Sequence, residues 1–174
     1  SKTIVKMIHS LLTTDNHINS TEKLRQWIEQ RNREVQVDVQ LIPFSEMDGW
    51  YVDEEGSLRH KSGRFFTIQG IHVETDYGNT HAWDQPIINQ PEIGYLGIIT
   101  KEMNGTLYFL MQAKIEPGNV NCVQISPTIQ ATKSNYTQVH KGKKPAYLDY
   151  FVNVKPENVL LDQLQSEEGA RFLS

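Results

Sequence analysis

The chain has 174 residues, 38% apolar and 22% charged, and 17 basic against 21 acidic residues give a net charge of −4. This length suits one domain with a core of its own, and net acidity offers no electrostatic basis for wrapping a nucleic acid. No apolar run approaches the ~20 residues of a membrane helix, and no signal segment opens the chain. A single cysteine, Cys122, excludes a disulfide within the chain. We expect a cytoplasmic protein whose partners include neither nucleic acid nor membrane.

Residues 1–34 are predicted to be helical. Leu24, Trp27 and Ile28 follow the i, i+3, i+4 spacing of an apolar helix face. Ser20 or Thr21 is a suitable N-cap for this helix, because a hydroxyl oxygen can accept a hydrogen bond from the first turn.

Residues 35–154 are predicted to form the sheet core. Val35 to Leu41 alternates apolar and polar residues, as a half-buried strand does, and Asn104-Gly105 is a strong hairpin signal between residues 93–103 and 106–115. Residues 83–92 hold two Gln-Pro pairs and are predicted to be a rigid extended loop. Residues 64–75, 120–130 and 147–154 are the other strand candidates.

The C-terminal segment, residues 155–174, is predicted to be helical. Pro156 suits a first helical turn, and Val159, Leu160 and Leu164 give a helical stripe. The predicted class is therefore α+β: one module over residues 1–174, with a mixed or antiparallel sheet flanked by N-terminal and C-terminal helices.

Polar side chains are predicted to gather on one face of two neighbouring strands. Leu107 to Ile115 places its odd-numbered apolar residues on a core face, and Gln112, Lys114 and Glu116 on the other. A tight turn at residues 117–119 would place Gln112 opposite Gln124. The face is either an ordinary solvent-facing surface or a binding surface for a ligand that carries many hydroxyl groups.

Two further segments have a structural and a functional interpretation. Glu92 follows the proline-containing loop, where it is either a general base or a surface carboxylate. Residues 132–136 could hold a phosphate or stack on a base, and simple turn chemistry explains them as well. The six histidines show no metal-ligand spacing, so we expect neither a metal nor a cofactor.

Six blocks of the sequence, in the same order, resemble the NDP-hexose 2,3-dehydratase family. They are residues 48–50 (DGW), 59–66 (RHKSGRFF), 85–94 (QPIINQPEIG), 111–119 (MQAKIEPGN), 124–136 (QISPTIQATKSNY) and 165–172 (QSEEGARF). The resemblance implies a Nudix-like fold and an enzyme that removes the C2 hydroxyl of an NDP-4-keto-6-deoxyhexose, typically linked to dTDP, to leave a 3,4-diketo sugar. The acidic metal motif of the Nudix hydrolases is missing, which argues against a pyrophosphohydrolase.

The family typically carries two tandem copies of this module, and the chain resembles the first. We therefore expect either an excised half or a single module that pairs as a homodimer. The alternative to a dehydratase is a non-catalytic module that binds a dTDP-sugar and supports a catalytic partner.

The resemblance also suggests roles for individual residues. Glu116 or Glu92 would be the base, and Lys114 with Gln112 would stabilise the enolate or protonate the leaving hydroxyl. Arg64 and Arg171 suit the diphosphate, because a guanidinium can bond two phosphate oxygens at once. The other predicted substrate contacts are Phe66, Trp83, Gln85, Gln124, Ser126, Thr128, Gln130, Ser134, Asn135, Tyr136 and Tyr147.

Overall fold

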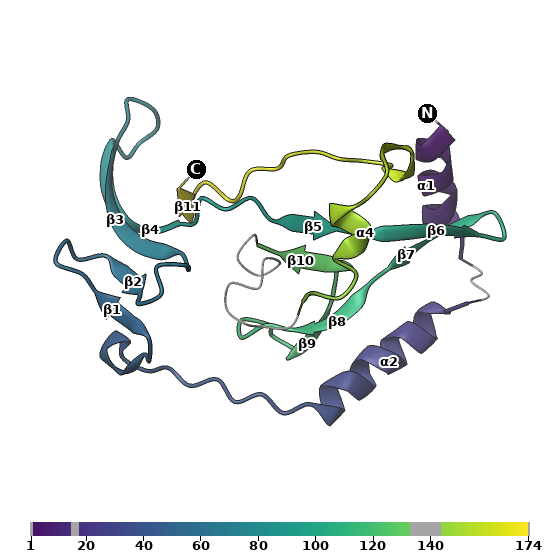
Figure 1. Cartoon of the computed structure of the whole chain (residues 1–174), viewed down its shortest axis with the longest axis horizontal. Coiled ribbons are helices and arrows are strands. Elements are labelled where there is room, and N and C mark those ends of the chain that lie inside the picture. Colours follow the sequence, from purple (N-terminus) through teal and green to yellow (C-terminus); the bar gives the residue numbers. More distant parts are fainter. Residues whose placement is uncertain (1, 15–17, 133–143, 174) are drawn as a thin grey trace. The chain divides into compact units, whose positions relative to one another are not determined.

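The computed structural model describes residues 2–14, 18–132 and 144–173, and these fall into two compact units (Figure 1). The first unit contains the described residues within 1–40, 94–132 and 143–161. The second contains those within 41–93 and 162–174. Each unit has its own sheet structure and is described by itself.

Two helices open the first unit, in agreement with the predicted helical segment. They are α1 (Lys2–Leu12) and α2 (Thr21–Glu34). The Ser20 hydroxyl accepts a hydrogen bond from the Lys23 backbone N–H at 3.2 Å and so caps α2. Near the other end of α2, the Asn32 side chain donates to the Val123 carbonyl and accepts from its N–H, both at 2.9 Å. The Asn32 amide therefore satisfies both backbone groups of Val123, which is 4% exposed.

The first unit is built from three bent strands. Each is interrupted once, so that six short strands result: β5 (Tyr95–Gly97) with β6 (Ile99–Met103), β7 (Thr106–Leu110) with β8 (Gln112–Ile115), and β9 (Val123–Ser126) with β10 (Ile129–Ala131). β6 pairs with β7, β8 with β9, and β10 with β5, all antiparallel. Each bent strand therefore pairs with one neighbour before its bend and with the other neighbour after it.

Thr128 joins these strands where they bend. Its hydroxyl accepts a hydrogen bond from the Ile99 N–H at 2.9 Å and donates one to the Leu110 carbonyl. The residue is 3% exposed. Backbone groups that are shielded from water need partners, and Thr128 provides them for two part-buried groups at the end of the β6–β7 ladder.

The hairpin between β6 and β7 forms as predicted. Met103 pairs with Thr106, and Asn104 and Gly105 both have positive φ, at 53° and 77°. Positive φ at both central residues is the geometry that an Asn-Gly turn favours.

The predicted register of the next hairpin is wrong by two residues. Gln112 faces Ser126 rather than Gln124, and Lys114 faces Gln124. The connection is longer than a tight turn because Asn119 organises it: its side chain donates to the carbonyls of Lys114 and Cys122. A shift of two residues keeps every side chain on its predicted face.

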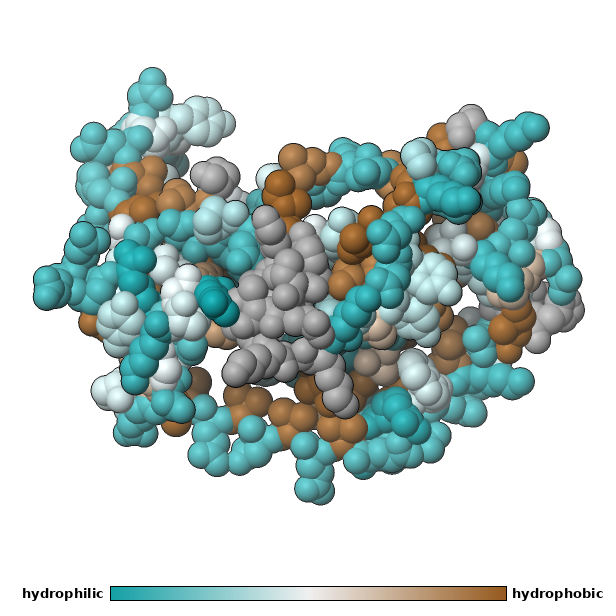
Figure 2. Space-filling view, in the orientation of Figure 1, coloured by the Kyte–Doolittle hydropathy of each residue, from teal (hydrophilic) through white to brown (hydrophobic). Residues whose placement is uncertain are grey.

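The core of the first unit is smaller than the alternation predicts. Leu107, Val123 and Ile129 are buried, but Phe109 is 42% and Ile125 50% exposed. Apolar side chains also lie at the surface along residues 35–42, the extended segment after α2 (Figures 1 and 2).

The second unit holds a five-stranded sheet in the order β1-β2-β3-β4-β11. Its strands are β1 (Trp50–Val52), β2 (Leu58–His60), β3 (Thr67–Glu74), β4 (Ala82–Asn89) and β11 (Phe172–Leu173), and a 3₁₀ turn, η1 (Phe44–Glu46), precedes them. All pairs are antiparallel except β4 with β11, which is parallel. The sheet is therefore mixed.

Strand β4 corrects the prediction of a loop over residues 83–92. Pro86 lies inside this strand, opposite Gly70 of β3. Two residues later, Ile88 donates its N–H to the Arg171 carbonyl on the β11 side. Because alternate residues of a strand direct their nitrogens to the same side, Pro86 faces the edge that β11 leaves uncovered, where no donor is required.

An ion pair stabilises the turn between β1 and β2. The Asp53 carboxylate accepts hydrogen bonds from the backbone of Glu55 and Ser57, at 3.0 and 2.8 Å, and from the Arg59 guanidinium. Chiefly the Arg59 bond, and then the Ser57 bond, lower the pKa of Asp53 from its ordinary value.

Two predicted strands are wrong. Residues 35–41 are extended but belong to no ladder among the described residues, and Leu41 is fully exposed. An alternating pattern becomes a strand only where a partner pairs with it. Residues 147–154 instead hold a short helix, α4 (Asp149–Val152), whose Phe151 ring packs against Gly97.

The predicted C-terminal helix is also wrong. Within the described residues 155–173 there are one 3₁₀ turn, η2 (Pro156–Asn158), and β11, with irregular chain between them. Leu160 and Leu164 of the predicted stripe are 48% and 77% exposed. Helices in proteins depend on burying an apolar face, and this stripe buries too little to stabilise one.

The α+β class is confirmed, with a mixed sheet and a few helices, and the Nudix likeness stays a prediction. No helix among the described residues is long and apolar enough to cross a membrane.

Candidate active site

A cluster of polar side chains lies at the end of the β8–β9 ladder, in the first unit. The Lys114 ammonium is 2.8 Å from Glu116 Oε1 and 3.0 Å from Gln130 Oε1. Lys114 and Glu116 are two residues apart and share a face, whereas Gln130 comes from β10. Gln124, the cross-strand partner of Lys114, lies on the same face. The sequence predicted this shared face for Lys114, Glu116 and Gln124.

The cluster is partly open to solvent. The Lys114 side chain is 29% exposed and that of Glu116 46%. An ammonium has three N–H donors, and within the described part of the chain two of them are used by Glu116 and Gln130. One donor is therefore available for an oxygen atom of a ligand, beside a carboxylate that can accept a proton.

Three predicted residues next to the cluster have structural roles. Gln112 donates from Nε2 to the Pro127 carbonyl at 2.9 Å, which fixes the bend between β9 and β10. Thr128 joins three strands, as described above, and Ser126 is 9% exposed. Gln112 and Thr128 thus hold the strands beside the cluster, and Ser126 and Thr128 are buried.

Other predicted contacts lie in the second unit. Trp83 Nε1 donates to Gln85 Oε1 at 2.7 Å, and Gln85 Nε2 donates to the Ala170 carbonyl at 2.8 Å. The Arg171 guanidinium is 3.4 Å from Glu168. These contacts bring Trp83 and Gln85 of β4 together with the segment that leads into β11.

Phe66 belongs to an aromatic cluster of the second unit. Its ring centroid is 5.1 Å from that of Trp50, whose indole also contacts His60 and Phe65. Arg64 adjoins this cluster in the sequence, and its backbone N–H donates to Ser62 at 3.3 Å. The sequence prediction omitted Trp50, although the pattern Asp48-Gly49-Trp50 marks it.

The remaining predicted residues that the structure describes, Glu92 and Tyr147, lie in the sequence outside residues 114–130, which contain the Lys114 cluster. Glu92 follows β4 and belongs to the second unit, whereas Tyr147 belongs to the first and packs 6.2 Å from Tyr150. Ser134, Asn135 and Tyr136 lie outside the described residues. No group of three or more metal-ligating side chains occurs within residues 2–14, 18–132 and 144–173.

The sequence prediction also missed a pair of ionisable side chains. His72 of β3 and Asp84 of β4 are cross-strand partners, with 2.7 Å between Nδ1 and Oδ1. A loop over residues 83–92, as the sequence predicts, gives residue 84 no cross-strand partner. The pairing of His72 with Asp84 therefore cannot be read from that prediction.

Comparisons with known proteins identify the family. The sequence profile of the NDP-hexose 2,3-dehydratase family matches residues 21–174. A protein of Saccharopolyspora spinosa named dTDP-4-dehydro-6-deoxy-alpha-D-glucopyranose 2,3-dehydratase is 47% identical over 168 residues, and one of the same name from Amycolatopsis orientalis is 48% identical over 170. A third protein of this name, from Streptomyces violaceoruber, is 44% identical over 158 residues.

These alignments cover 96%, 94% and 90% of the chain, but only 35%, 36% and 36% of the three relatives. The chain thus spans about a third of the length of the curated relatives it matches. By the extent of the profile match and by these identities, the chain belongs to the NDP-hexose 2,3-dehydratase family.

Proposed function

We propose that this chain takes part in the 2,3-dehydration of a dTDP-linked 4-keto-6-deoxyhexose, with the Lys114 cluster as the catalytic site. One observation carries the proposal: the Lys114 ammonium is held between the carboxylate of Glu116 and the amide oxygen of Gln130, at 2.8 and 3.0 Å. A proton acceptor and a cationic donor therefore stand side by side. The substrate is that named for the relatives.

The reaction needs those two groups. The C3 hydrogen of a 4-keto sugar is acidic because it is α to the carbonyl. Glu116 takes this proton, and the electron pair moves into the C3–C4 bond, so that negative charge develops on the C4 oxygen. Lys114 donates a hydrogen bond to this oxygen.

Loss of the C2 hydroxyl completes the dehydration. The enolate electrons form the C2–C3 double bond as the C2–O bond breaks, and hydroxide leaves as water after accepting a proton. The enol formed at C3 then tautomerises to the 3-ketone, so one water is lost and a 3,4-diketo sugar remains. Glu116, protonated in the first step and beside Lys114, is the donor we propose for the departing oxygen.

Residues of the second unit remain proposed nucleotide contacts. Arg64 and Arg171 suit a diphosphate, because guanidinium groups bond phosphate oxygens in pairs. Phe66, within the aromatic cluster around Trp50, is suited to stack on a base. Glu92 is kept as a second candidate base, and Ser134, Asn135 and Tyr136 as candidate contacts.

The assembly and the setting are part of the same proposal. A second module of the family or a second copy of this chain is the partner that we propose, since the relatives are about three times as long as this chain. A reducing cytoplasm fits a chain whose one cysteine, Cys122, cannot form an internal disulfide.

A second candidate function is sugar-nucleotide binding without catalysis, which the partial coverage of the relatives favours. Mass spectrometry of dTDP-4-keto-6-deoxyglucose incubated with the chain separates the two. A product lighter by one water, which Lys114→Met abolishes and Lys101→Met retains, supports the dehydratase. Binding with no change in mass supports the binding module, and neither binding nor turnover contradicts both.

A further inference from the structure

A glycine in the middle of β3 has no structural explanation within the described chain. Gly70 lies inside an eight-residue strand, where glycine is unfavourable because it provides no side chain to pack. It does not have a positive φ, and a Cβ added there would meet no atom within 4 Å. Neither backbone conformation nor packing requires glycine. Glycine inside a strand marks a bulge, a tight bend, or a position that a ligand or another backbone approaches closely, and the unbroken pairing of β3 with β4 excludes a bulge.

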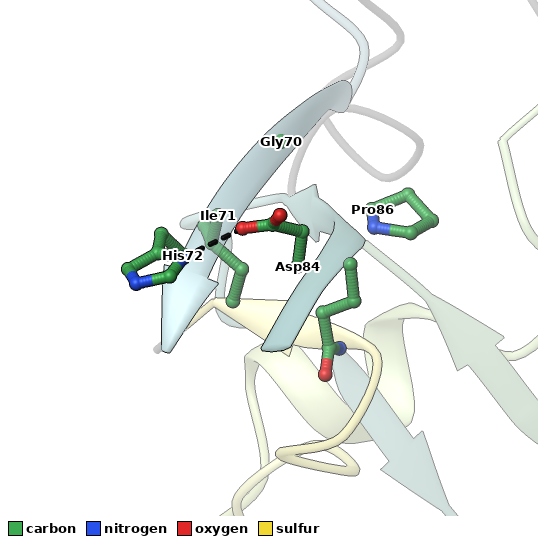
Figure 3. Close-up of a pocket in the computed structure, with 6 residues that line it drawn as sticks. Gly70, Ile71, His72, Asp84 and Pro86 are labelled. Atoms are coloured by element: carbon green, nitrogen blue, oxygen red, sulfur yellow. Dashed lines mark hydrogen bonds and ion pairs between the residues drawn. The ribbon is translucent and has the colours of Figure 1, made fainter. Parts of the chain in front are cut away.

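Gly70 belongs to a shallow pocket on the β3–β4 hairpin (Figure 3). The lining residues are Gly70, Ile71, His72, Asp84, Gln85 and Pro86, all of the second unit. Pro86 is the cross-strand partner of Gly70, and His72 is the partner of Asp84. The close-up shows Asp84 between the His72 ring, to which it is hydrogen-bonded, and the Pro86 ring.

The charges in and beside this pocket restrict the class of ligand. Asp84, which lines the pocket, and Glu74, which lies beside it, are carboxylates, 84% and 80% exposed, and the His72 ring is within 3.5 Å of both. Two carboxylates repel phosphate groups, so a diphosphate is excluded from the pocket. Asp84 bonds His72 through Oδ1, which leaves Oδ2 as an acceptor of hydroxyl hydrogens.

We propose that this pocket is a second ligand site, which binds a neutral hydroxylated ring of the pyranose class. The C–H face of the ring lies on Pro86 over the space that Gly70 leaves open. Hydroxyl groups donate to Asp84, whose position His72 fixes. A cross-strand ion pair that only stabilises the hairpin accounts for His72 and Asp84, but it leaves the glycine unexplained. None of the lining residues belongs to the Lys114 cluster, and Gln85 alone among them is also a predicted substrate contact, so the site is tested without reference to dehydratase activity.

The test follows backbone and histidine signals by NMR while methyl α-D-glucopyranoside is added to the isotope-labelled chain. We expect saturable shifts at Gly70 and His72 in the unmodified chain. Gly70→Val fills the pocket with a residue that strands favour, so these shifts are lost while the thermal unfolding midpoint does not fall. Asp84→Asn weakens binding about tenfold or more, as loss of a hydrogen bond to a charged acceptor does.

A matched variant and two further probes sharpen the result. Asp76→Asn removes the same charge from the turn of the same hairpin and leaves the affinity unchanged. The proposal is overturned if the glucoside causes no saturable shift, or if Gly70→Val binds it as the unmodified chain does. If methylamine shifts the Gly70 and His72 signals more strongly than the glucoside does, the assignment of a neutral ligand is overturned. If inorganic pyrophosphate shifts these signals, the exclusion of phosphate groups is overturned. None of these measurements depends on turnover at Lys114. Absence of glucoside binding at this pocket is therefore distinguishable from absence of dehydratase activity.

Discussion

Replacing Glu116 by glutamine tests whether the Lys114–Glu116 pair is catalytic or an ordinary surface ion pair. The substitution keeps the shape of the side chain and removes its charge and its ability to accept a proton. If Glu116 takes the C3 proton, the rate of dehydration falls by about 10²–10⁴-fold. That loss corresponds to about 2.7–5.4 kcal/mol in the activation barrier.

The effect of the same substitution on stability should be small. Two unit charges 2.8 Å apart attract each other by about 1.5 kcal/mol in a water-like dielectric. Side chains this exposed lose part of that energy to solvent screening and to side-chain entropy, which leaves about 0–1 kcal/mol. A large loss of rate with a small change in the free energy of unfolding therefore identifies a chemical role.

The chain provides a matched control in the same unit. Glu102 pairs with Lys6, and their side chains are 44% and 50% exposed, so Glu102→Gln removes a carboxylate from a comparable pair. The assay measures kcat and KM for dTDP-4-keto-6-deoxyglucose, with urea unfolding of each variant. Catalysis by Glu116 is refuted if Glu116→Gln and Glu102→Gln both keep kcat within about twofold of the unmodified chain.

Three further predictions concern stability. Thr128→Val removes the partner of two part-buried backbone groups, the Ile99 N–H and the Leu110 carbonyl. It should lower the free energy of unfolding in urea by about 1–3 kcal/mol, while the nucleotide Kd stays constant; a weaker Kd at unchanged stability would make Thr128 a ligand contact instead. Gly97→Ala places a Cβ 2.2 Å from the Phe151 ring and should lower the free energy of unfolding by about 1–3 kcal/mol. Phe151→Leu in the same chain should restore part of this loss. Equal unfolding midpoints for Gly97→Ala and the unmodified chain would contradict this packing. The pKa of Asp53 is lowered mainly by Arg59, so its contribution is complete above the unfolded pKa of about 3.9 and is lost as the pH falls through the lower folded pKa. Asp53→Asn should thus flatten the acid limb of stability against pH, and parallel acid limbs would exclude this contribution.

Features that depend on near neighbours in the sequence could be predicted. Asn104-Gly105 forms its hairpin because both residues tolerate positive φ, and Ser20 caps α2 because its hydroxyl lies three residues before a free backbone N–H. Lys114 and Glu116 share a face because side chains alternate along any strand. Each of these outcomes follows from local geometry alone.

Features that depend on distant partners could not be predicted. Residues 35–41 alternate as a strand does, but no described strand pairs with them. Pro86 suggested a loop, and its place in β4 depends on β11, which begins 86 residues later in the chain and leaves the edge beside Pro86 uncovered. Thr128 was predicted to contact substrate because the alternation pattern is uninterrupted, whereas the bend at Pro127 turns its hydroxyl to two other strands.

The most direct test of the dehydratase proposal is proton NMR of dTDP-4-keto-6-deoxyglucose with the chain in D₂O. The account predicts loss of the C3 proton signal, because this hydrogen is abstracted. It also predicts loss of the signal of the C2 proton beside the hydroxyl group, because the 3,4-diketo sugar forms with deuterium at C2. Glu116→Gln should slow both changes together. An unchanged sugar, with thymidine signals that shift on binding, would contradict catalysis by this chain and favour a sugar-nucleotide binding module.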